Sequence, residues 1–345
     1  MKLGLRYDMR RASFSVDSPE QQYQACLEQC AWADAAGFDR ITLSEHHGSA
    51  DGYCGATTVL GAGIAARTAS ATVALRALLV PLHDPVRLAE ELAVLDLLAN
   101  GRLELLFGIG YRPEEFRMFG VDVRRRGRLL EDGVEVIKRA WSGQPFSYRG
   151  AEILVLPRPV QRPRPRIVLG GSTDAAARRA ARIADGYDPV PAAAGTFATY
   201  RAECRRLGKT PCEPRRNEPD AVFLMVAEDP AAVWRTVAPY AVHEANSYAE
   251  WNLAAGLPTA YPRADAEGLR RSGQYRVVTP AECLALAREV GPEGRLTFHP
   301  LMGGLPIELS WRSLRLVEKA VIPRLRAEGL LDDTQPSGSV RSVSP

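Results

Sequence analysis

The sequence lacks the features that mark several large classes of protein. No apolar run approaches the roughly 18 residues that cross a membrane, and the best candidate, residues 71–82, is short and carries Arg76. Its 44 basic and 41 acidic side chains leave a formal net charge of only +3. This balance argues against a nucleic-acid-binding protein and against a polybasic membrane-surface protein. We therefore expect neither nucleic acid nor a membrane as a partner.

Cysteine is also sparse, and the sequence shows no sign of secretion. Six cysteines at irregular spacing, without a C-x-x-C pair, do not form a disulfide framework. Cys26 and Cys30 are four residues apart on an expected helix, where core packing explains them. Met1 and Lys2 lead directly into a strand-like segment, so we expect no signal peptide and a cytoplasmic protein.

What the chain does contain is an alternation of strand and helix patterns. Strands are predicted at 2–5, 40–44, 72–80, 103–109, 167–169, 221–226 and 296–298, and helices at 19–36, 55–67, 86–99, 128–141, 174–184 and 307–328. This order predicts an α/β protein with a single (β/α)8 TIM barrel with insertions over residues 1–331. A doubly wound open sheet is the alternative. Further predictions are a surface hairpin or loop at 144–165, a long loop or lid at 256–275 and a disordered tail at 332–345.

Histidines gather where the predicted strands end, which is where a barrel carries its chemistry. His46 and His47 follow the second strand, and neighbouring strand residues point to opposite faces, so only one is expected to face the barrel mouth. A histidine there is a candidate general acid or base. The alternative is a histidine held by a backbone carbonyl. A metal site is not expected, because Glu45, His46 and His47 in a row do not easily converge on one ion.

Two glycine-rich turns are candidate binding sites. Residues 170–174, Gly-Gly-Ser-Thr-Asp, end a strand and open a helix, which suits either a phosphate or an ordinary helix cap. The Gly108-Ile109-Gly110 turn fails as a dinucleotide fingerprint, because Pro113 stands where the third glycine belongs. It remains suited to packing against a flat ring.

The predicted helix at 86–99 has apolar residues on most of its circumference. An outer barrel helix normally keeps one wet face. We therefore expect a second copy of the chain to cover this helix in a homodimer, with cover by a local insertion as the alternative.

Taken together, these stretches resemble the bacterial luciferase-like flavin-dependent monooxygenase family over residues 1–190 and again over 277–328. The most specific segments are 44–47 (SEHH), 81–87 (PLHDPVR), 95–103 (Leu-Asp to Gly-Arg-Leu), 110–120 (GYRPEEF to Phe-Gly), 170–172 (GGS) and 180–186 (AAR to Asp-Gly). Residues 190–276 give no comparable support.

The resemblance implies a (β/α)8 barrel that binds reduced FMN at its mouth and uses O2 to oxidise a small organic substrate through a C4a-peroxyflavin. By this match His46 falls on the family's catalytic histidine, and Glu45 on the acidic residue before it. Ala77 and Leu78 fall where the family often has a bulge or a non-prolyl cis peptide under the flavin ring. The remaining expected cofactor contacts are Gly110, Tyr111, Gly170, Gly171 and Ser172.

The resemblance also leaves alternatives open. Where luciferase itself carries a phosphate-binding arginine, this chain has Ile109, so Arg112 or a later arginine is expected to grip the phosphate instead. No nicotinamide fingerprint is present, so a separate reductase is expected to supply the reduced FMN in a two-component system. The alternatives are an F420-dependent oxidoreductase that transfers hydride on the same barrel, a non-catalytic flavin-binding protein and a plain α/β module.

Overall fold

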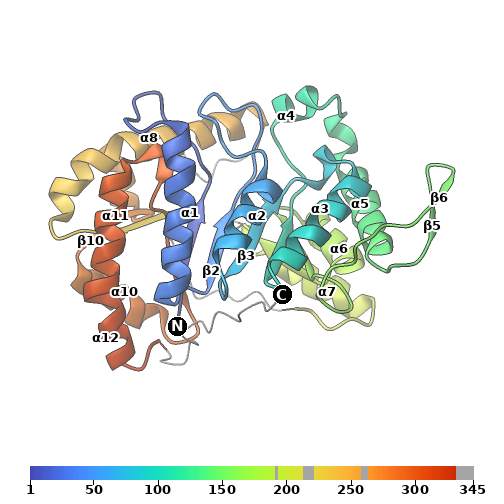
Figure 1. Cartoon of the computed structure of the whole chain (residues 1–345). Helices are drawn as coiled ribbons and strands as arrows, with labels where there is room; N and C mark the ends of the chain where they lie inside the picture. Colours follow the sequence, from blue (N-terminus) through green and yellow to red (C-terminus); the bar gives the residue numbers. More distant parts are fainter. Residues whose placement is uncertain (191–192, 213–220, 258–262, 332–345) are drawn as a thin grey trace.

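A parallel sheet of seven strands organises the computed structural model, which describes residues 1–190, 193–212, 221–257 and 263–331. In the order of their pairing the strands are β11 (Arg295–Phe298), β1 (Lys2–Tyr7), β2 (Arg40–Leu43), β3 (Thr72–Leu78), β4 (Leu103–Phe107), β7 (Ile167–Gly171) and β8 (Gly186–Pro189). All neighbouring pairs are parallel, as helical crossovers between successive strands require. The sheet is curled, with helices on its outer face (Figure 1).

Two short sheets accompany this arc of seven strands. β9 (Phe223–Val226) pairs in parallel with β10 (Tyr275–Val278), and β5 (Phe146–Tyr148) forms an antiparallel hairpin with β6 (Ala151–Ile153). The predicted α/β barrel is therefore present as a curled parallel sheet, but the strand pairs of the described residues do not form a complete closed ring. The hairpin projects from one side of the molecule and lies within residues 144–165, where a surface hairpin or loop is expected (Figure 1).

Helices follow most strands and pack on the outside of the sheet. They are α1 (Pro19–Ala36), α2 (Thr57–Arg67), α3 (Pro85–Leu98), α4 (Pro113–Met118), α5 (Arg126–Ala140), α6 (Asp174–Ile183), α7 (Thr196–Arg206), α8 (Pro230–Ala254), α9 (Ala266–Ser272), α10 (Pro280–Val290), α11 (Ile307–Leu316) and α12 (Ile322–Ala327). Local sequence sets many of their ends. Ser18 caps α1 in a reciprocal capping box with Gln21, and Gly37 ends that helix at a φ of 92°.

The largest departure from the sequence prediction lies between residues 230 and 275. α8 is a helix of 25 residues where no helix was predicted, and α9 occupies part of the predicted long loop at 256–275. That loop prediction is wrong for residues 266–275, because Asp265 caps α9 and Tyr275 begins β10. Residues 258–262, and the predicted tail at 332–345, lie outside the described residues.

Alternation along the strands separates an apolar outer face from a polar inner face. On β1, Leu3, Leu5 and Tyr7 are fully buried under the helices, while Gly4 and Arg6 occupy the other face. Cys26 and Cys30 of α1 lie in the same core, as the sequence predicted.

The inner face of the sheet carries charged side chains where barrels usually carry branched apolar ones. Arg76 of β3 forms ion pairs with Glu104 of β4, at 2.5 Å, and with Asp188 of β8. β3 and β8 are not neighbours in the sheet, so Arg76 connects two strands across its concave side.

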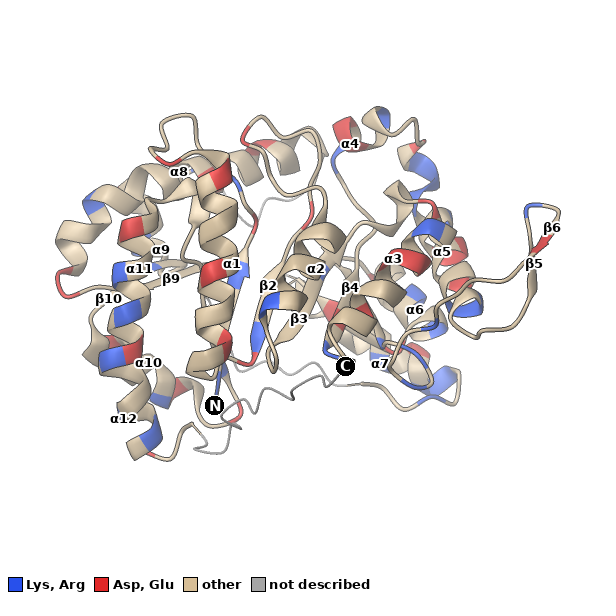
Figure 2. Ribbon diagram, in the orientation of Figure 1, with Lys and Arg blue, Asp and Glu red and all other residues tan. Residues whose placement is uncertain are grey.

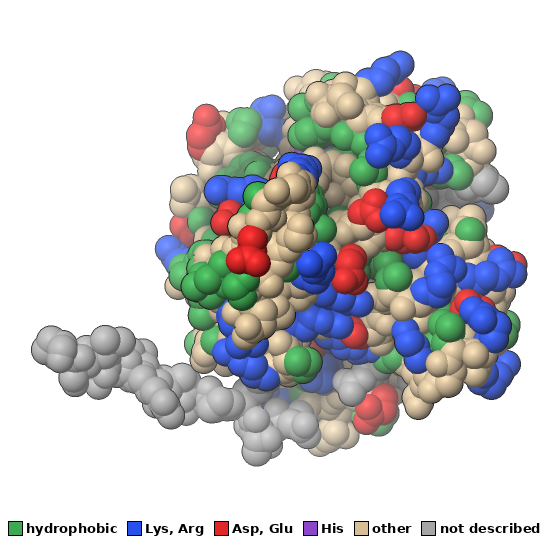
Figure 3. Space-filling model, turned by 90° about the vertical axis from the view of Figure 1, so that its right-hand side faces the viewer, with side chains coloured by type: hydrophobic (Ala, Val, Ile, Leu, Met, Phe, Trp, Pro, Cys, Tyr) green, Lys and Arg blue, Asp and Glu red, His purple; other side chains and the backbone are tan. Residues whose placement is uncertain are grey.

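Charge on the surface is mixed in sign. Lys and Arg alternate with Asp and Glu along the outer helices (Figure 2), and both signs are interspersed on the face shown in Figure 3. Among the described residues, no helix is long and apolar enough to cross a membrane.

Candidate active site

His46 lies just after β2, and its orientation is set by a carboxylate from another segment. Its Nδ1 is 2.7 Å from Oε1 of Glu115, which lies in the first turn of α4. Because a carboxylate can only accept, the proton of this hydrogen bond sits on Nδ1, which leaves Nε2 of the neutral ring as an acceptor. The ring is therefore prepared to take a proton at Nε2.

Glu115 is held by three donors through the same oxygen. Besides His46, it accepts from the His47 backbone N–H at 2.9 Å and from Arg112 Nη1 at 3.2 Å. Burial alone would raise the pKa of Glu115, but these donors lower it below its ordinary value. Arg112 Nη1 also donates to the His47 carbonyl at 2.9 Å, which fixes the turn after His46.

Glu45 points away from His46 and organises a separate network. Its Oε1 accepts from His47 Nε2 at 2.7 Å and from His83 Nε2 at 2.9 Å, and its Oε2 accepts from the Leu79 backbone N–H at 3.2 Å. Burial raises the pKa of Glu45, but the hydrogen bonds from the two histidines outweigh it and lower the pKa to about 2. We call these four groups the Glu45 network.

The prediction that only one of the two histidines faces the barrel mouth is consistent with this arrangement. Glu45 and His47 share one face of the chain and bond to each other, while His46 takes the opposite face and bonds to Glu115. The assignment of Glu45 as a catalytic group remains a prediction, and its contacts make it a support for the Leu79 backbone.

The expected flavin-supporting segment has the expected irregularity. The peptide bond between Arg76 and Ala77 is cis, and the register of β3 against β4 shifts between Arg76 and Leu78. Glu45 binds the next N–H along, that of Leu79. The backbone of Ala77 and Leu78 thus lies beside the turn at residues 108–111, since the Gly108 N–H donates to the Leu78 carbonyl at 2.8 Å.

The two glycine turns keep their backbones bare for steric reasons. A Cβ at Gly108 would approach that of Ala77 to 3.0 Å, and one at Gly171 would approach that of Ala176 to 2.4 Å. Gly110 adopts a φ of 73°, in the left-handed region that favours glycine. Ser172 is exposed at the start of α6, and Thr173 caps that helix by accepting from the Ala176 N–H. These turns fit a flat ring and a phosphate approached through backbone N–H groups.

Arg112 is not placed as a phosphate ligand at these turns. Its guanidinium binds the His47 carbonyl and Glu115, and its centre lies 4.0 Å from the ring centroid of Trp251. The expectation that Arg112 or a later arginine replaces the arginine missing at Ile109 stays a prediction, and the contacts of Arg112 place it beside His46.

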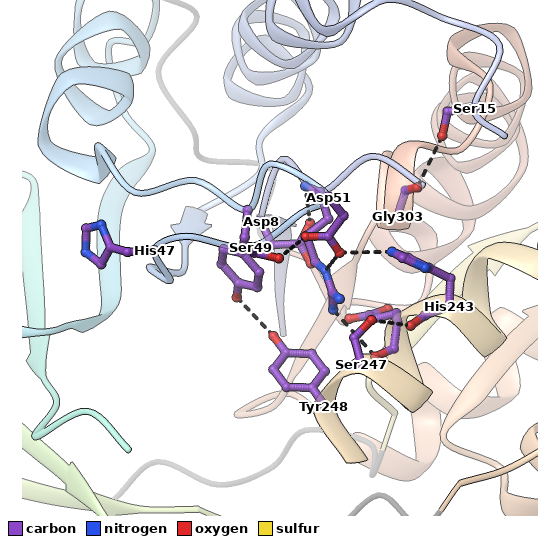
Figure 4. Close-up of polar contacts among 12 residues, drawn as sticks. Asp8, Ser15, His47, Ser49, Asp51, His243, Ser247, Tyr248 and Gly303 are labelled. Carbon is purple, nitrogen blue, oxygen red and sulfur yellow. Dashed lines mark hydrogen bonds and ion pairs between the residues drawn. The ribbon is translucent and has the colours of Figure 1, made fainter. Parts of the chain in front are cut away.

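A second polar network joins the loop at residues 48–51 to α8 (Figure 4). Asp51 accepts from Arg10 Nε at 2.7 Å and lies 2.9 Å from His243 Nε2, while Ser49 donates to its other oxygen. Burial raises the pKa of Asp51, but the hydrogen bond with His243 and the charge of Arg10 lower it below its ordinary value. In Figure 4, His47 lies apart from this cluster.

Fully buried charged groups extend this network toward β1 and β11. Asp8, Glu244 and His299 are 0–1% exposed, and their donor atoms lie within 4.8 Å of one another. Asp8 Oδ2, both Glu244 carboxylate oxygens and both His299 ring nitrogens have no hydrogen-bond partner among the described residues. Burial raises the pKa of Glu244. With Arg10, Asp51 and His243, these residues form what we call the α8 network.

Two groups of side chains are spaced closely enough to hold a metal ion. One is Asp8, Glu244 and His299, and the other is Glu45, His47 and His83. Glu45, His46 and His47 in a row do not easily converge on one ion, but Glu45 and His47 share a face of the chain, to which His83 adds a third group. Hydrogen bonds already hold the Glu45 set together, whereas the Asp8 set has, among the described residues, only two ion pairs of 3.7 Å, Arg6–Glu244 and His299–Asp8.

Aromatic rings pack around His46. Tyr53 and Tyr248 join through their hydroxyls at 3.0 Å, and Trp251 of α8 packs beside the imidazole with a centroid distance of 5.1 Å. A surface hollow of about 640 Å³ is lined by the 48–51 loop and by residues of α8, including Trp251.

Five residues contribute to the site without having been predicted from the sequence: Arg10, Glu115, His243, Tyr248 and Trp251. A signal for the three α8 residues was present. Asp229-Pro230 is a helix start, and buried positions follow at helical spacing: 234, 237, 238, 241, 245 and 249. Of three further residues near the ends of the strands, Tyr53 and His299 join the site, whereas Tyr187 is buried in the core against Phe197.

A family model described as luciferase-like monooxygenase matches residues 7–291. The oxygenase component of a flavin-dependent trigonelline monooxygenase from Acinetobacter baylyi is 29% identical over 174 residues, which is 48% of each chain. The chain spans about half the length of the curated relatives it matches.

Two solved structures share the fold over nearly the whole chain. One is the oxygenating constituent of 3,6-diketocamphane monooxygenase from Pseudomonas putida in complex with FMN, with a TM-score of 0.70, 20% identity and coverage of 94% of this chain and 98% of that one. The other is an F420-dependent secondary alcohol dehydrogenase with an F420-acetone adduct, with a TM-score of 0.62, 17% identity and coverage of 93% and 98%.

Proposed function

Because the chain belongs to the luciferase-like monooxygenase family, we propose that it is a flavin-dependent monooxygenase that uses reduced FMN and O2 to oxidise a small organic substrate. The observation that carries this proposal is the His46–Glu115 pair. It lies at the mouth of the curled sheet, next to the irregular end of β3 and the glycine turn at residues 108–111.

The fit of the flavin rests on the bare backbone at three strand ends. Ala77, Leu78, Gly110 and Tyr111 would lie along the ring, and residues 170–172 would hold the phosphate through backbone N–H groups and the Ser172 hydroxyl. When bound, reduced FMN supplies the electrons that activate O2 for transfer of one oxygen atom to the substrate.

The protein's own part is to move one proton and to exclude water. His46 takes and returns a proton at Nε2, while Glu115 fixes the tautomer and stabilises the imidazolium form. Glu45 holds the β3 end in place through Leu79. The rings of Tyr53 and Trp251 cover His46 and limit the water that would otherwise divert the oxidant.

The proposed function also implies two protein partners, a flavin reductase and a second copy of the chain. A separate flavin reductase would deliver reduced FMN, a proposal supported by the relative that is itself an oxygenase component. A homodimer would cover α3, where Val94, Leu97 and Leu98 are 40–50% exposed, together with Val59 of α2.

The test is an anaerobic titration of the purified protein with reduced FMN and, separately, with reduced F420, followed by admission of oxygen. We expect saturable binding of reduced FMN and a reoxidation rate that differs from that of free reduced FMN. Preference for F420, without a change in reoxidation, assigns the chain to hydride transfer instead. Binding of neither cofactor contradicts the proposed cofactor site.

A further inference from the structure

Four aromatic rings gather around the side chain proposed to move the proton. Their centroids lie 4.9 to 6.3 Å from that of His46, and they come from the segment after β2, the turn after β4 and α8: Tyr53, Tyr111, Tyr248 and Trp251. Aromatic residues make up only 7% of the chain, so this wall is locally enriched. Ring faces stack best on flat rings, whereas a long alkyl chain is usually lined by aliphatic side chains.

Two buried guanidinium groups lie against the same wall. The central carbons of Arg10 and Arg112 are 4.9 Å and 4.0 Å from the Trp251 ring centroid, and their residues are 1% and 4% exposed. Each has one nitrogen without a hydrogen-bond partner among the described residues, Nη2 of Arg10 and Nε of Arg112. A buried unpaired donor is costly, and a ligand oxygen is the group that relieves it.

Two of the four rings, those of Tyr248 and Trp251, come from α8. Tyr248 extends from α8 toward the segment after β2, where its hydroxyl meets that of Tyr53 (Figure 4). α8 thus supplies two of the four rings, and its Trp251 contacts both arginines. The helix that the sequence prediction missed therefore supplies half of this aromatic wall.

We propose that the substrate is a flat aromatic or heteroaromatic acid, with its ring against the Trp251 wall and its carboxylate oxygens directed to the free N–H groups of Arg10 and Arg112. This inference rests on the proposed function, because it names the substrate class of that site. It excludes long alkyl chains and aromatic amines as the preferred ligands.

The test is equilibrium binding to the full chain by calorimetry, with and without FMN, using four small probes. Benzoate is compared with cyclohexanecarboxylate, which lacks the flat ring, with benzylamine, which reverses the charge, and with decanoate, which replaces the ring by a chain. We expect benzoate to bind at least about tenfold more tightly than each of the others. Equal binding of cyclohexanecarboxylate or decanoate, preference for benzylamine, or no benzoate binding with or without FMN overturns the proposal.

A variant pair locates the site. Trp251→Leu should weaken benzoate binding about tenfold, while Trp251→Phe should retain most of it. Trp32→Leu is the matched control, because Trp32 is also partly buried but lies on α1, where it donates to Glu318. Unchanged binding in Trp251→Leu, or an equal loss in Trp32→Leu, contradicts the assigned wall. Reduced FMN titration of the same preparations separates this outcome from a failure of the flavin site.

Discussion

The Glu45 network and the α8 network lie near each other at the mouth of the sheet but differ in how completely their polar atoms are paired. In the Glu45 network, one carboxylate satisfies two imidazoles and a backbone N–H, all within segments that follow β2 and β3. In the α8 network, Asp8, Glu244 and His299 are more deeply buried and yet keep atoms without a hydrogen-bond partner among the described residues. A fully paired buried network fixes geometry, whereas an incompletely paired one carries a cost in stability that functional sites often tolerate.

This difference in hydrogen bonding indicates that the two networks have different roles. The Glu45 network holds the backbone on which the flavin ring is proposed to lie. The α8 network belongs to the side from which the substrate is proposed to approach. The following predictions test this assignment of roles, beginning with the group between the two networks.

His46→Ala should lower single-turnover product formation by about 10²- to 10⁴-fold, the usual contribution of a positioned acid or base. Binding of reduced FMN should change by less than about twofold, since the expected cofactor contacts are backbone groups elsewhere. Chromatography of the product formed per reduced FMN checks the expected loss of product formation. The anaerobic dissociation constant checks that binding of reduced FMN is retained. An unchanged product yield would remove His46 from the mechanism.

Glu45→Gln should lower the free energy of unfolding by about 2–3 kcal/mol at pH 7, because charge-assisted hydrogen bonds from two histidines are lost. Since the folded pKa of Glu45 is about 2, its contribution is present above the unfolded value and disappears as the pH falls from about 4.5 toward 2. Urea unfolding of both proteins at pH 7 and pH 4 measures this. A constant difference across that range would show that packing, not the charge, is responsible.

His83→Gln tests the same network from the histidine side and should have a smaller effect. Burial lowers the pKa of His83, but the hydrogen bond to Glu45 raises it above its ordinary value. A raised pKa adds stability that is present below about pH 6.5 and is lost as the pH rises through the folded pKa. The wild type should therefore lose more stability than His83→Gln between pH 6 and pH 9, as thermal melts across this range would reveal.

Glu244→Gln should have the smallest effect, within about 0.5 kcal/mol at pH 4. Its carboxylate oxygens have no hydrogen-bond partner, although Arg6 lies 3.7 Å away. Because the folded pKa is raised, the wild type loses stability as the pH rises above the unfolded value of about 4.5. The variant should be the more stable protein at pH 8. A large loss there would mean that Glu244 is ionised and paired like Glu45, and the comparison between the networks would fail.

Sequence patterns predicted one of these regions much better than the other. The strands that position Glu45 and His46 alternate apolar and polar residues, and Ser18 and Asp84 mark helix starts by local capping. Alternation predicts that His46 and His47 face opposite sides, and the family resemblance points to His46 as the one at the mouth. Its partner Glu115, 69 residues away, follows from neither, because only the packing of α4 brings the two together.

Local sequence patterns could not predict most contacts of the α8 network. Asp8 and Glu244 are far apart in sequence, and no local rule links the end of β1 to the middle of a helix. α8 itself had a start signal and a helical spacing of buried residues. The predicted long loop over 256–275 likewise gave too much weight to glycine and proline, and missed the cap at Asp265.

Arg76 links strands of the curled sheet that are not neighbours, and this link matters for any attempt to exchange loops or strands at the mouth. Its ion pairs with Glu104 and Asp188 connect β3 to β4 and to β8 across the concave side of the sheet. Arg76 lies immediately before the segment expected under the flavin. The curvature at this edge is thus set by three side chains as well as by backbone pairing. A transplanted loop or strand that removes Arg76 therefore loses both ion pairs that cross this side of the sheet, while Glu104 keeps its ion pair with Arg40 at 2.7 Å.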